Sequence, residues 1–279
     1  METSTPEYAI NASSIFSSAT GFIKRGGFSW TCNPYIGCTF GCLYCYAMYL
    51  PSNRRPKEDW GKWFQAKINA IELARKQAKK LAGQAVYMSS VTDPYIPIEK
   101  TLMLSRGILE ALQPQQPRLL VQTRGPLVVR YIDVLEQFRS VRVNVSIPTD
   151  SEEVRLHFEP KAPPLEKRWE AMQQLKAAGI PVGICLTPLL PVANVDAFVE
   201  KVVEFNPTVL VTQDFHNSNG GFGANTSDAA RAVVEKMHWT VEDYCRCRDR
   251  FRQKRETFEA EAGFFPPPET PNQTEWLIA

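Results

Sequence analysis

Short apolar runs alternate along this chain with longer stretches in which apolar residues recur every three or four positions. The short runs are typical of buried strands and lie at residues 28–36, 85–91, 118–123, 141–147, 181–187 and 208–213. The spacing between them predicts helices at about 62–82, 99–112, 126–138, 164–178 and 195–205. Gly83 and Gly179 follow two of these stretches, at positions where glycine commonly ends a helix. The pattern therefore predicts a βα unit repeated six times.

Six βα units are too few for a closed eight-stranded barrel of roughly 250 residues. They predict an α/β fold with a partial (β/α)6 barrel of the TIM type, whose active site would lie at the C-terminal ends of the strands. We expect an N-terminal extension at residues 1–27 and the barrel at residues 28–215. Residues 216–279 are expected to form a loop, a charged helix and a proline-rich tail, which together make a helical C-terminal extension.

Composition narrows the class of protein. The 279 residues are 44% hydrophobic, which suffices for a full core, and the net charge of +2 imposes no general attraction to nucleic acid or to a membrane. Seven cysteines, an odd number, argue against a disulfide scaffold and for a reducing compartment. The N-terminus has no basic start followed by an apolar run, and no apolar stretch approaches the roughly 20 residues that span a bilayer. We expect a soluble, cytoplasmic protein with no membrane association.

Three cysteines, Cys38, Cys42 and Cys45, fall within eight residues. Three soft thiolates on one loop suit a cuboidal iron–sulfur cluster whose fourth iron has no protein ligand and is free to bind another molecule. A tetrahedral zinc site is the alternative, because its cysteines have similar spacing. Three other cysteines could supply its fourth ligand: Cys32, Cys245 and Cys247.

The residues around this cysteine loop resemble a known signature. Residues 33–38 read Asn-Pro-Tyr-Ile-Gly-Cys, Cys42 follows, and residues 44–47 read Tyr-Cys-Tyr-Ala. This pattern resembles the signature of the radical S-adenosylmethionine (radical SAM) enzymes. Residues 89–99 and 145–150 are similar to segments of the spore photoproduct lyase-like branch of that superfamily. The resemblance spans roughly residues 28–215, so it covers the whole predicted barrel.

The resemblance implies a cofactor and a type of chemistry. A 4Fe-4S cluster would be held by Cys38, Cys42 and Cys45, and its fourth iron would bind the amino and carboxylate groups of S-adenosyl-L-methionine. One electron, delivered by a reductant protein such as flavodoxin or ferredoxin, would cleave the cofactor and yield a 5'-deoxyadenosyl radical. This radical would abstract hydrogen from a substrate that the resemblance leaves open, with nucleic acid among the candidates.

Polar residues at the predicted strand ends are candidates for binding that cofactor. By resemblance, Ser90 and Asp93 would contact its amino group, and Ser146 its ribose. Arg124 could pair with its carboxylate through two parallel hydrogen bonds. Each has a plain structural alternative: a strand-to-loop turn for Ser90 and Asp93, a surface arginine for Arg124, and a small packed residue for Ser146.

Tyr44 and Tyr46 flank the third cysteine. In spore photoproduct lyases, tyrosines at matching positions contact the cofactor or relay a hydrogen atom, so we expect Tyr44 to contact the cofactor and Tyr46 to act in catalysis; packing around the cluster is the alternative. Those lyases also carry a hydrogen-donating cysteine where this chain has Met88 and Ser89. That difference argues against repair of thymine dimers. Three cysteines could replace the missing thiol: Cys185, Cys245 and Cys247.

Two C-terminal features complete the hypotheses. Six cationic residues within residues 246–255 could follow the phosphates of a nucleic acid, but interleaved acids favour a solvated, ion-paired helix. The glycine-bearing segment around His216 could be a substrate loop or a plain connection. The sequence thus predicts a radical SAM enzyme of lyase or oxidoreductase type. The alternatives are radical modification of a peptide, RNA or small metabolite rather than repair of a DNA lesion, and a non-enzymatic zinc–cysteine module that binds nucleic acid.

Overall fold

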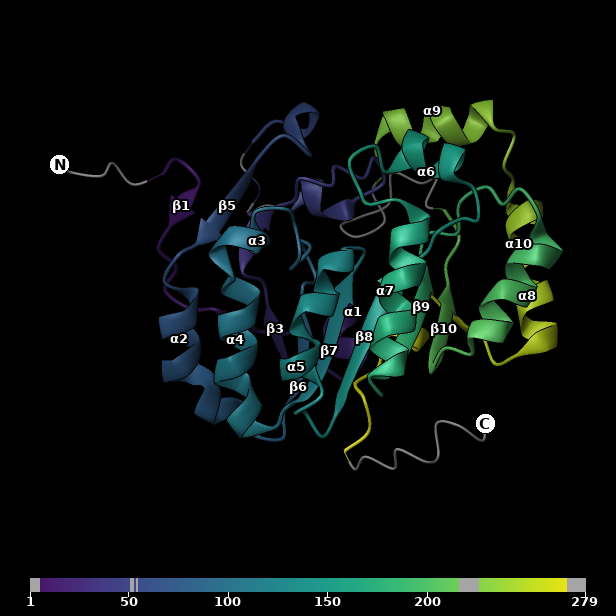
Figure 1. The fold of residues 1–279 in the computed structure, drawn as a ribbon. Helices are drawn as coiled ribbons and strands as arrows, with labels where there is room; N and C mark the ends of the chain where they lie inside the picture. Colours follow the sequence, from purple (N-terminus) through teal and green to yellow (C-terminus); the bar gives the residue numbers. More distant parts are fainter. Residues whose placement is uncertain (1–5, 51–52, 54, 216–225, 270–279) are drawn as a thin grey trace.

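A computed structural model describes residues 6–50, 53, 55–215 and 226–269, which form two sheets and the helices around them (Figure 1). The larger sheet has the strand order β11-β10-β9-β8-β7-β6-β3-β2, and the smaller has the order β1-β5-β4. The strands are β1 Ala9–Ile10, β2 Phe16–Ser18, β3 Trp30–Cys32, β4 Tyr35–Gly37, β5 Phe64–Lys67, β6 Ala85–Met88, β7 Arg118–Thr123, β8 Val141–Ser146, β9 Val182–Leu186, β10 Val209–Thr212 and β11 Phe258–Glu259.

Helices fill the connections between the strands. They are α1 Gly21–Arg25, α2 Ala70–Gln77, α3 Glu99–Leu102, α4 Leu104–Leu112, α5 Ile132–Leu135, α6 Glu152–Phe158, α7 Leu165–Ala177, α8 Val195–Phe205, α9 Asp228–Lys236 and α10 Val241–Lys254. Among the described residues, none of them is long and apolar enough to cross a membrane.

Six neighbouring strands of the large sheet, β3 and β6 to β10, run parallel in chain order. A contact between side chains of β7 and β9 indicates that the sheet is curled. The Sγ of Cys185 on β9 donates to the Oε1 of Gln122 on β7 at 3.5 Å, across the intervening β8. In a flat sheet those two strands would stand roughly 9.6 Å apart, with their side chains upright. The predicted partial barrel of six βα units is confirmed.

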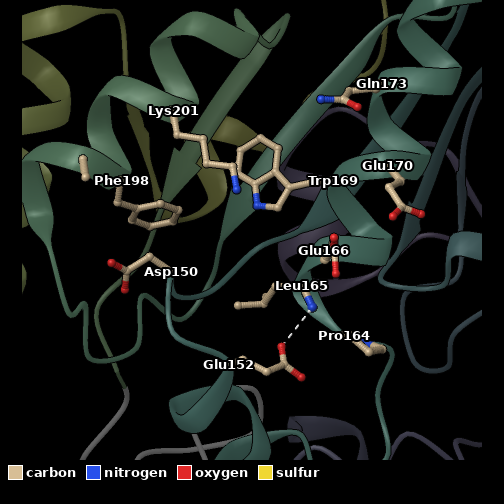
Figure 2. A pocket seen from close by; sticks show the side chains of 11 residues that line it. Asp150, Glu152, Pro164, Leu165, Glu166, Trp169, Glu170, Gln173, Phe198 and Lys201 are labelled. Carbon is tan, nitrogen blue, oxygen red and sulfur yellow. Dashed lines mark hydrogen bonds between the residues drawn. The ribbon is translucent and has the colours of Figure 1, made fainter.

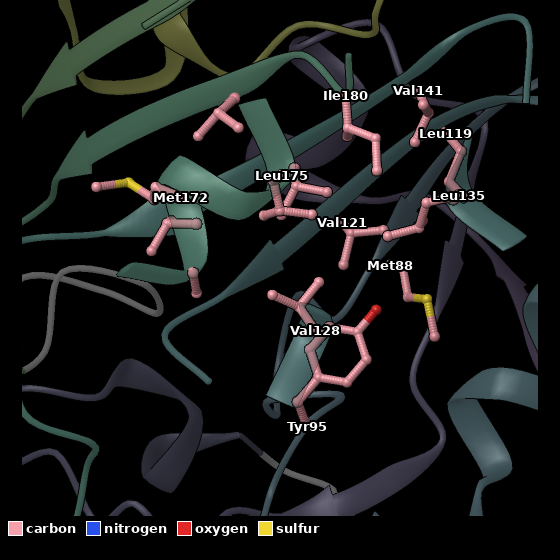
Figure 3. Close-up of a cluster of buried hydrophobic side chains, with 14 of the residues drawn as sticks. Met88, Tyr95, Leu119, Val121, Val128, Leu135, Val141, Met172, Leu175 and Ile180 are labelled. Atoms are coloured by element: carbon pink, nitrogen blue, oxygen red, sulfur yellow. The ribbon is translucent and has the colours of Figure 1, made fainter. Parts of the chain in front are cut away.

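Side chains that point out of this barrel form the main core. Alternate residues of β7 and β8, such as Val121 and Val143, pack against Leu135, Met172 and other helix residues that no water reaches (Figure 3). Helices α2, α4, α5, α7 and α8 lie on this outer face (Figure 1). Since the strands are covered by helices here, their apolar runs read as nearly continuous in the sequence.

The inner face of the barrel is closed by segments from both ends of the chain. Phe28 and Phe264 pack among inward residues of the strands. The guanidinium of Arg142 donates to the backbone oxygen of Phe265 at 2.6 Å, and that of Arg118 donates to the backbone oxygen of Pro267 at 2.8 Å. The proline-rich tail is therefore held at the end of the barrel where the strands begin.

Two predicted elements near the N-terminus were wrong. The predicted strand at 28–36 is split, because β3 ends at Cys32 and β4 belongs to the small sheet. Pro34 stands between them and has no N–H to extend a ladder. The predicted helix at 62–82 begins only at Ala70, because residues 64–67 pair with β1 and β4 as strand β5. Pairing between distant segments outweighed the local helical spacing.

Two further predicted helices are interrupted, and two helices, α1 and α6, were missed. Met103 has a φ of 49° and separates α3 from α4, while residues 126–131 form a 3-10 helix before the short α5. Helix α6 was not predicted, although Ser151 caps it by accepting a hydrogen bond from the N–H of Val154 at 3.3 Å. The helix lies above the strand ends, where it contributes to the site described next.

Candidate functional site

The cysteine loop, residues 38–45, crosses the edge at which the parallel strands end. Three contacts fix it: the hydroxyl of Thr92 donates to the carbonyl oxygen of Gly37 at 2.6 Å, and the N–H of Leu43 donates to the carbonyl oxygen of Phe158 at 2.8 Å. The third is a close approach of Gly41, whose φ is 63°, to the backbone of Gly61. The loop after β4 is thereby tied both to the loop after β6 and to helix α6.

All three thiols of this loop are free. Cys38 and Cys42 are buried and Cys45 is half-buried, and burial raises the pKa of each thiol to about 12. The guanidinium of Arg124 opposes this rise at each thiol. The positive charge of Arg124 therefore acts on all three thiols, and a nearby cation favours the thiolate form in which cysteine binds a metal.

The donor set fits a cluster better than a single ion. Among the described residues, no three His, Cys, Asp or Glu side chains converge closely enough to hold one metal ion. A zinc ion requires its sulfur ligands at about 2.3 Å from one centre, whereas an iron–sulfur cluster distributes its thiolates over separate irons. None of the cysteines suggested as a fourth zinc ligand joins the loop: Cys32 and Cys247 lie in the outer core, and Cys245 packs beside it.

Beside the cysteine loop lies a buried ionic group that we call the Glu159 cluster: Tyr44, Arg124, Glu159 and Arg168. The carboxylate of Glu159 accepts a hydrogen bond from the hydroxyl of Tyr44 at one oxygen and pairs with the guanidinium of Arg168 at the other. The Nε of Arg124 lies 3.3 Å from the first oxygen, and its Nη2 donates to the Tyr44 hydroxyl at 3.3 Å. Arg168 also donates to the backbone oxygen of Ser146 at 3.0 Å.

The Glu159 cluster carries one surplus positive charge. Burial by itself raises the pKa of Glu159, but Arg168 and Arg124 outweigh it and hold this pKa below its usual value. Burial raises the pKa of Tyr44 well above its usual value, so the phenol is neutral. Within these four residues, two guanidinium groups against one carboxylate leave a net charge of +1, and the nearby Asp93 carboxylate offsets part of it at Arg124. The Nε–H of Arg124 is buried without a hydrogen bond. Since an unmatched buried charge is costly, the site is suited to an anionic ligand.

The carboxylate of Asp93 is bound within the protein rather than left free for a ligand. Its buried carboxylate accepts hydrogen bonds from the Tyr95 N–H at 2.9 Å, the Thr123 hydroxyl at 2.9 and 3.0 Å, and the Arg124 N–H at 2.9 Å. These bonds correspond to the turn alternative, and they fix the backbone of Arg124 at the end of β7. The contact of Asp93 with a cofactor stays a prediction.

The two predicted serines lie at the ends of β6 and β8, the strands on either side of β7. Ser90 accepts a hydrogen bond from the side chain of Asn33 at 3.3 Å, and its backbone oxygen accepts one from the hydroxyl of Tyr46. Ser146, at the end of β8, is buried and accepts a hydrogen bond from Gln122 at 3.1 Å. Both serines, with Tyr46 and Arg124, border the edge that the cysteine loop crosses, while their roles toward a cofactor stay predictions.

Sequence reasoning missed Glu159 and Arg168. Both side chains are 0% exposed, which for charged residues marks a built ion pair. Glu159 follows the helix that was not predicted, and Arg168 lies on the inward face of α7. The sequence offered one signal for Arg168. The apolar spacing along α7 assigns its position to the core, where an arginine needs a partner.

The remaining cysteines divide between the two faces of the barrel. Cys185 lies inside, where burial raises its pKa to about 12 and it shares the Gln122 oxygen with the hydroxyl of Tyr87 at 3.5 Å. Cys245 and Cys247 lie on α10 and pack toward the outer core. Of the three cysteines considered as replacements for the missing thiol, Cys185 is the one that faces the barrel interior.

The basic helix α10 is ion-paired. Its arginines bind acids on the same helix and on neighbouring elements, in the pairs Arg246–Asp243, Arg248–Asp249, Arg248–Glu259, Arg250–Asp196 and Arg252–Glu259. This arrangement favours the ion-paired alternative over a phosphate-binding surface. The segment around His216 lies outside the described residues.

A cavity of about 640 Å³ lies between the N-terminal halves of α7 and α8, outside the barrel (Figure 2). The ammonium of Lys201 sits 4.7 Å from the ring centre of Trp169. Asp150 and Glu152 line the cavity, but they accept hydrogen bonds from the backbone N–H groups of Ala193, Asn194 and Leu165. None of the predicted site residues lines this cavity, so we place the functional site at the strand ends.

Comparison with known proteins gives three findings. A profile described as the Radical SAM superfamily matches residues 32–202. An uncharacterized protein of Methanocaldococcus jannaschii is 34% identical over 168 residues, which are 60% of this chain and 63% of that protein. An uncharacterized protein of Acidianus two-tailed virus is 32% identical over 216 residues, 71% of this chain and 70% of that protein.

A solved structure shares the fold. Spore photoproduct lyase complexed with dinucleoside spore photoproduct superimposes with a TM-score of 0.62 at 14% identity, over 90% of this chain and 80% of that one. At this identity the likeness concerns the arrangement of helices and strands alone. It agrees with the barrel of six parallel strands described above.

Proposed function

Since this chain belongs to the radical SAM superfamily, we propose that it binds a 4Fe-4S cluster and S-adenosyl-L-methionine where its parallel strands end, and that it initiates radical chemistry there. One observation carries the proposal: three free thiols within eight residues lie beside a buried cluster with one surplus positive charge. When bound, the two groups supply a 5'-deoxyadenosyl radical that abstracts a hydrogen atom. Membership of the superfamily implies an enzyme, and we propose a lyase or an oxidoreductase.

The roles of the protein's own residues follow from their positions. Cys38, Cys42 and Cys45 would hold the cluster, and Arg124, whose Nε–H makes no hydrogen bond in the structure, would orient the carboxylate of the cofactor. Asp93 fixes the backbone from which this arginine projects. The hydroxyl of Ser90 would accept a hydrogen bond from the amino group, and that of Ser146 would contact the ribose.

The missing thiol bears on the class of substrate. At the end of β6 this chain has Met88, which is buried in the outer core and carries no donor hydrogen comparable to that of a thiol. We therefore favour radical modification of a peptide, RNA or small metabolite over dimer repair. A lyase reaction is still compatible with this chain, because Cys185 is a thiol in the barrel interior and would return the hydrogen atom. A flavodoxin or ferredoxin would deliver the electron.

The test is to purify the protein anaerobically, reconstitute it, and measure iron, sulfide and zinc together with deoxyadenosine released after addition of reductant and cofactor. We expect about four irons and four sulfides per chain, with release of deoxyadenosine. Tightly bound zinc without deoxyadenosine would contradict the proposal. A variant with Cys185→Ala separates the reaction types, because loss of product with deoxyadenosine retained would indicate that this thiol returns the hydrogen.

A further inference from the structure

Glu159 joins three parts of the site without being a plausible ligand itself. Its carboxylate receives the hydroxyl of Tyr44 from the cysteine loop and lies 3.3 Å from the Nε of Arg124 at the end of β7. Its other oxygen pairs with Arg168, which in turn donates to the carbonyl of Ser146 at the end of β8. No water reaches the side chain of Glu159. Both of its oxygens are used within the protein, so none is left for a cofactor.

We propose that Glu159 is a positioning residue that fixes the guanidinium of Arg124, together with the phenol of Tyr44, for binding the cofactor's carboxylate. This inference rests on the proposed function, in which Arg124 is the contact to that carboxylate. Arg168 is the second anchor, because it connects Glu159 to the backbone at the end of β8. The cysteine loop, β7 and β8 are then coupled through a single carboxylate.

Charge and geometry both favour this role. A free arginine side chain has many rotamers, and fixing one before the ligand arrives removes that entropic cost from binding. Glu159 pairs with Arg124 but does not neutralise the cluster, because Arg168 supplies a second positive charge. Arg124 is therefore held in place while the surplus charge is kept for the ligand. Asp93 fixes the backbone of Arg124 in the same way that Glu159 fixes its side chain.

The test compares two cofactors that differ only in the carboxylate. Dissociation constants for S-adenosylmethionine and for decarboxylated S-adenosylmethionine are measured on reconstituted protein of equal iron content. We expect the wild type to prefer the carboxylate form by at least tenfold. Arg124→Gln should reduce this preference at least fivefold, and the remainder would come from the cluster iron, which would bind the same carboxylate. Glu159→Gln should reduce the preference at least fivefold, since its amide NH₂ must face a donor on one side.

A matched control lies on the same segment. Glu152 on α6 also pairs with an arginine, Arg155, but its side chain is 46% exposed and does not touch Arg124. Glu152→Gln should keep the wild-type preference. A generally weakened fold would lower the affinity for both cofactors alike and leave their ratio unchanged, so the ratio distinguishes positioning from stability.

A charge-balanced variant keeps the test valid if Glu159→Gln fails to fold. Glu159→Gln with Arg168→Gln retains the net charge of +1, and it should also reduce the preference at least fivefold. If the folded Glu159 variants keep the wild-type preference while Arg124→Gln reduces it, the inference is overturned and the proposed function stays intact. Equal affinity of the wild type for both cofactors would instead overturn the assignment of Arg124, and with it this inference.

Discussion

The hydroxyl of Tyr46 donates a hydrogen bond to the backbone oxygen of Ser90. This bond joins the turn after the third cysteine to the loop after β6, two segments separated by 44 residues. Burial raises the pKa of the Tyr46 phenol above its usual value, so the hydroxyl stays protonated and can donate. The side chain of Tyr46 therefore helps to set the position of Ser90 relative to the cysteine loop, together with the bond from Thr92 to Gly37.

Tyr46→Phe keeps the ring and removes this bond. We expect unchanged iron content and an S-adenosylmethionine dissociation constant raised about fivefold, which corresponds to the ~1 kcal/mol of one hydrogen bond. A catalytic role would add a second effect, a lower yield of product per deoxyadenosine. Tyr49→Phe in the same 3-10 helix is the control, and an equal effect there would contradict a specific role of Tyr46.

Cys42→Ala and Cys32→Ala test which thiols hold the cluster. Cys42 belongs to the cysteine loop, whereas Cys32 ends β3 and packs in the outer core. We expect Cys42→Ala to abolish cluster assembly, measured as iron and sulfide per chain after reconstitution, and Cys32→Ala to leave it intact. Equal loss in both variants would show that the ligands are assigned wrongly.

Gly37→Ala should disturb the loop just before its first cysteine. Gly37 has a φ of 75°, and a Cβ there would lie 2.7 Å from the ring of Trp63. Gly83 is a matched control, because its φ is 66° but a Cβ would meet nothing within 4 Å. We expect Gly83→Ala to cost about 1 kcal/mol of unfolding free energy through backbone strain alone. Gly37→Ala should cost about 1–3 kcal/mol more because of the overlap, and it should lower iron incorporation. Equal losses in denaturant unfolding would contradict the overlap.

Glu99 should make stability fall as the pH rises. Its buried carboxylate accepts hydrogen bonds from Tyr35, Tyr131 and the N–H of Ser105, yet burial outweighs these bonds and raises its pKa above the usual value. The folded state thus keeps a proton that the unfolded chain loses near pH 4.5. The stability linked to this proton is present below that pH and is lost as the pH rises through the folded-state pKa.

Glu99→Gln removes the titrating group, so the prediction concerns a difference between two proteins. The unfolding free energy of the wild type minus that of the variant should decrease as the pH rises from about 4 to 7. Denaturant titrations at several pH values measure it. A difference that stays constant or grows with pH would show that the folded protein favours the ionised carboxylate.

Local patterns predicted much of this protein because they report on local physics. The apolar runs at 118–123 and 141–147 became β7 and β8, since a strand covered by helices must be apolar along its length. The spacing of Cys38, Cys42 and Cys45 places three thiols on one loop whatever surrounds them. The position of Arg124 after a strand predicted its place at the strand ends.

Other features depended on segments that are distant in the sequence. Residues 64–67 have helical spacing but form β5, because β1 and β4 supply partners that no local pattern reveals. Glu159 and Arg168 look like ordinary charged residues of a loop and a helix, and only the packing of α6 and α7 over the strand ends buries them together. The sequence by itself determined how strands and helices alternate along the barrel and that three thiols lie on one loop. The tertiary structure decided which charges surround them, because burial and pairing of charges depend on every segment that excludes water.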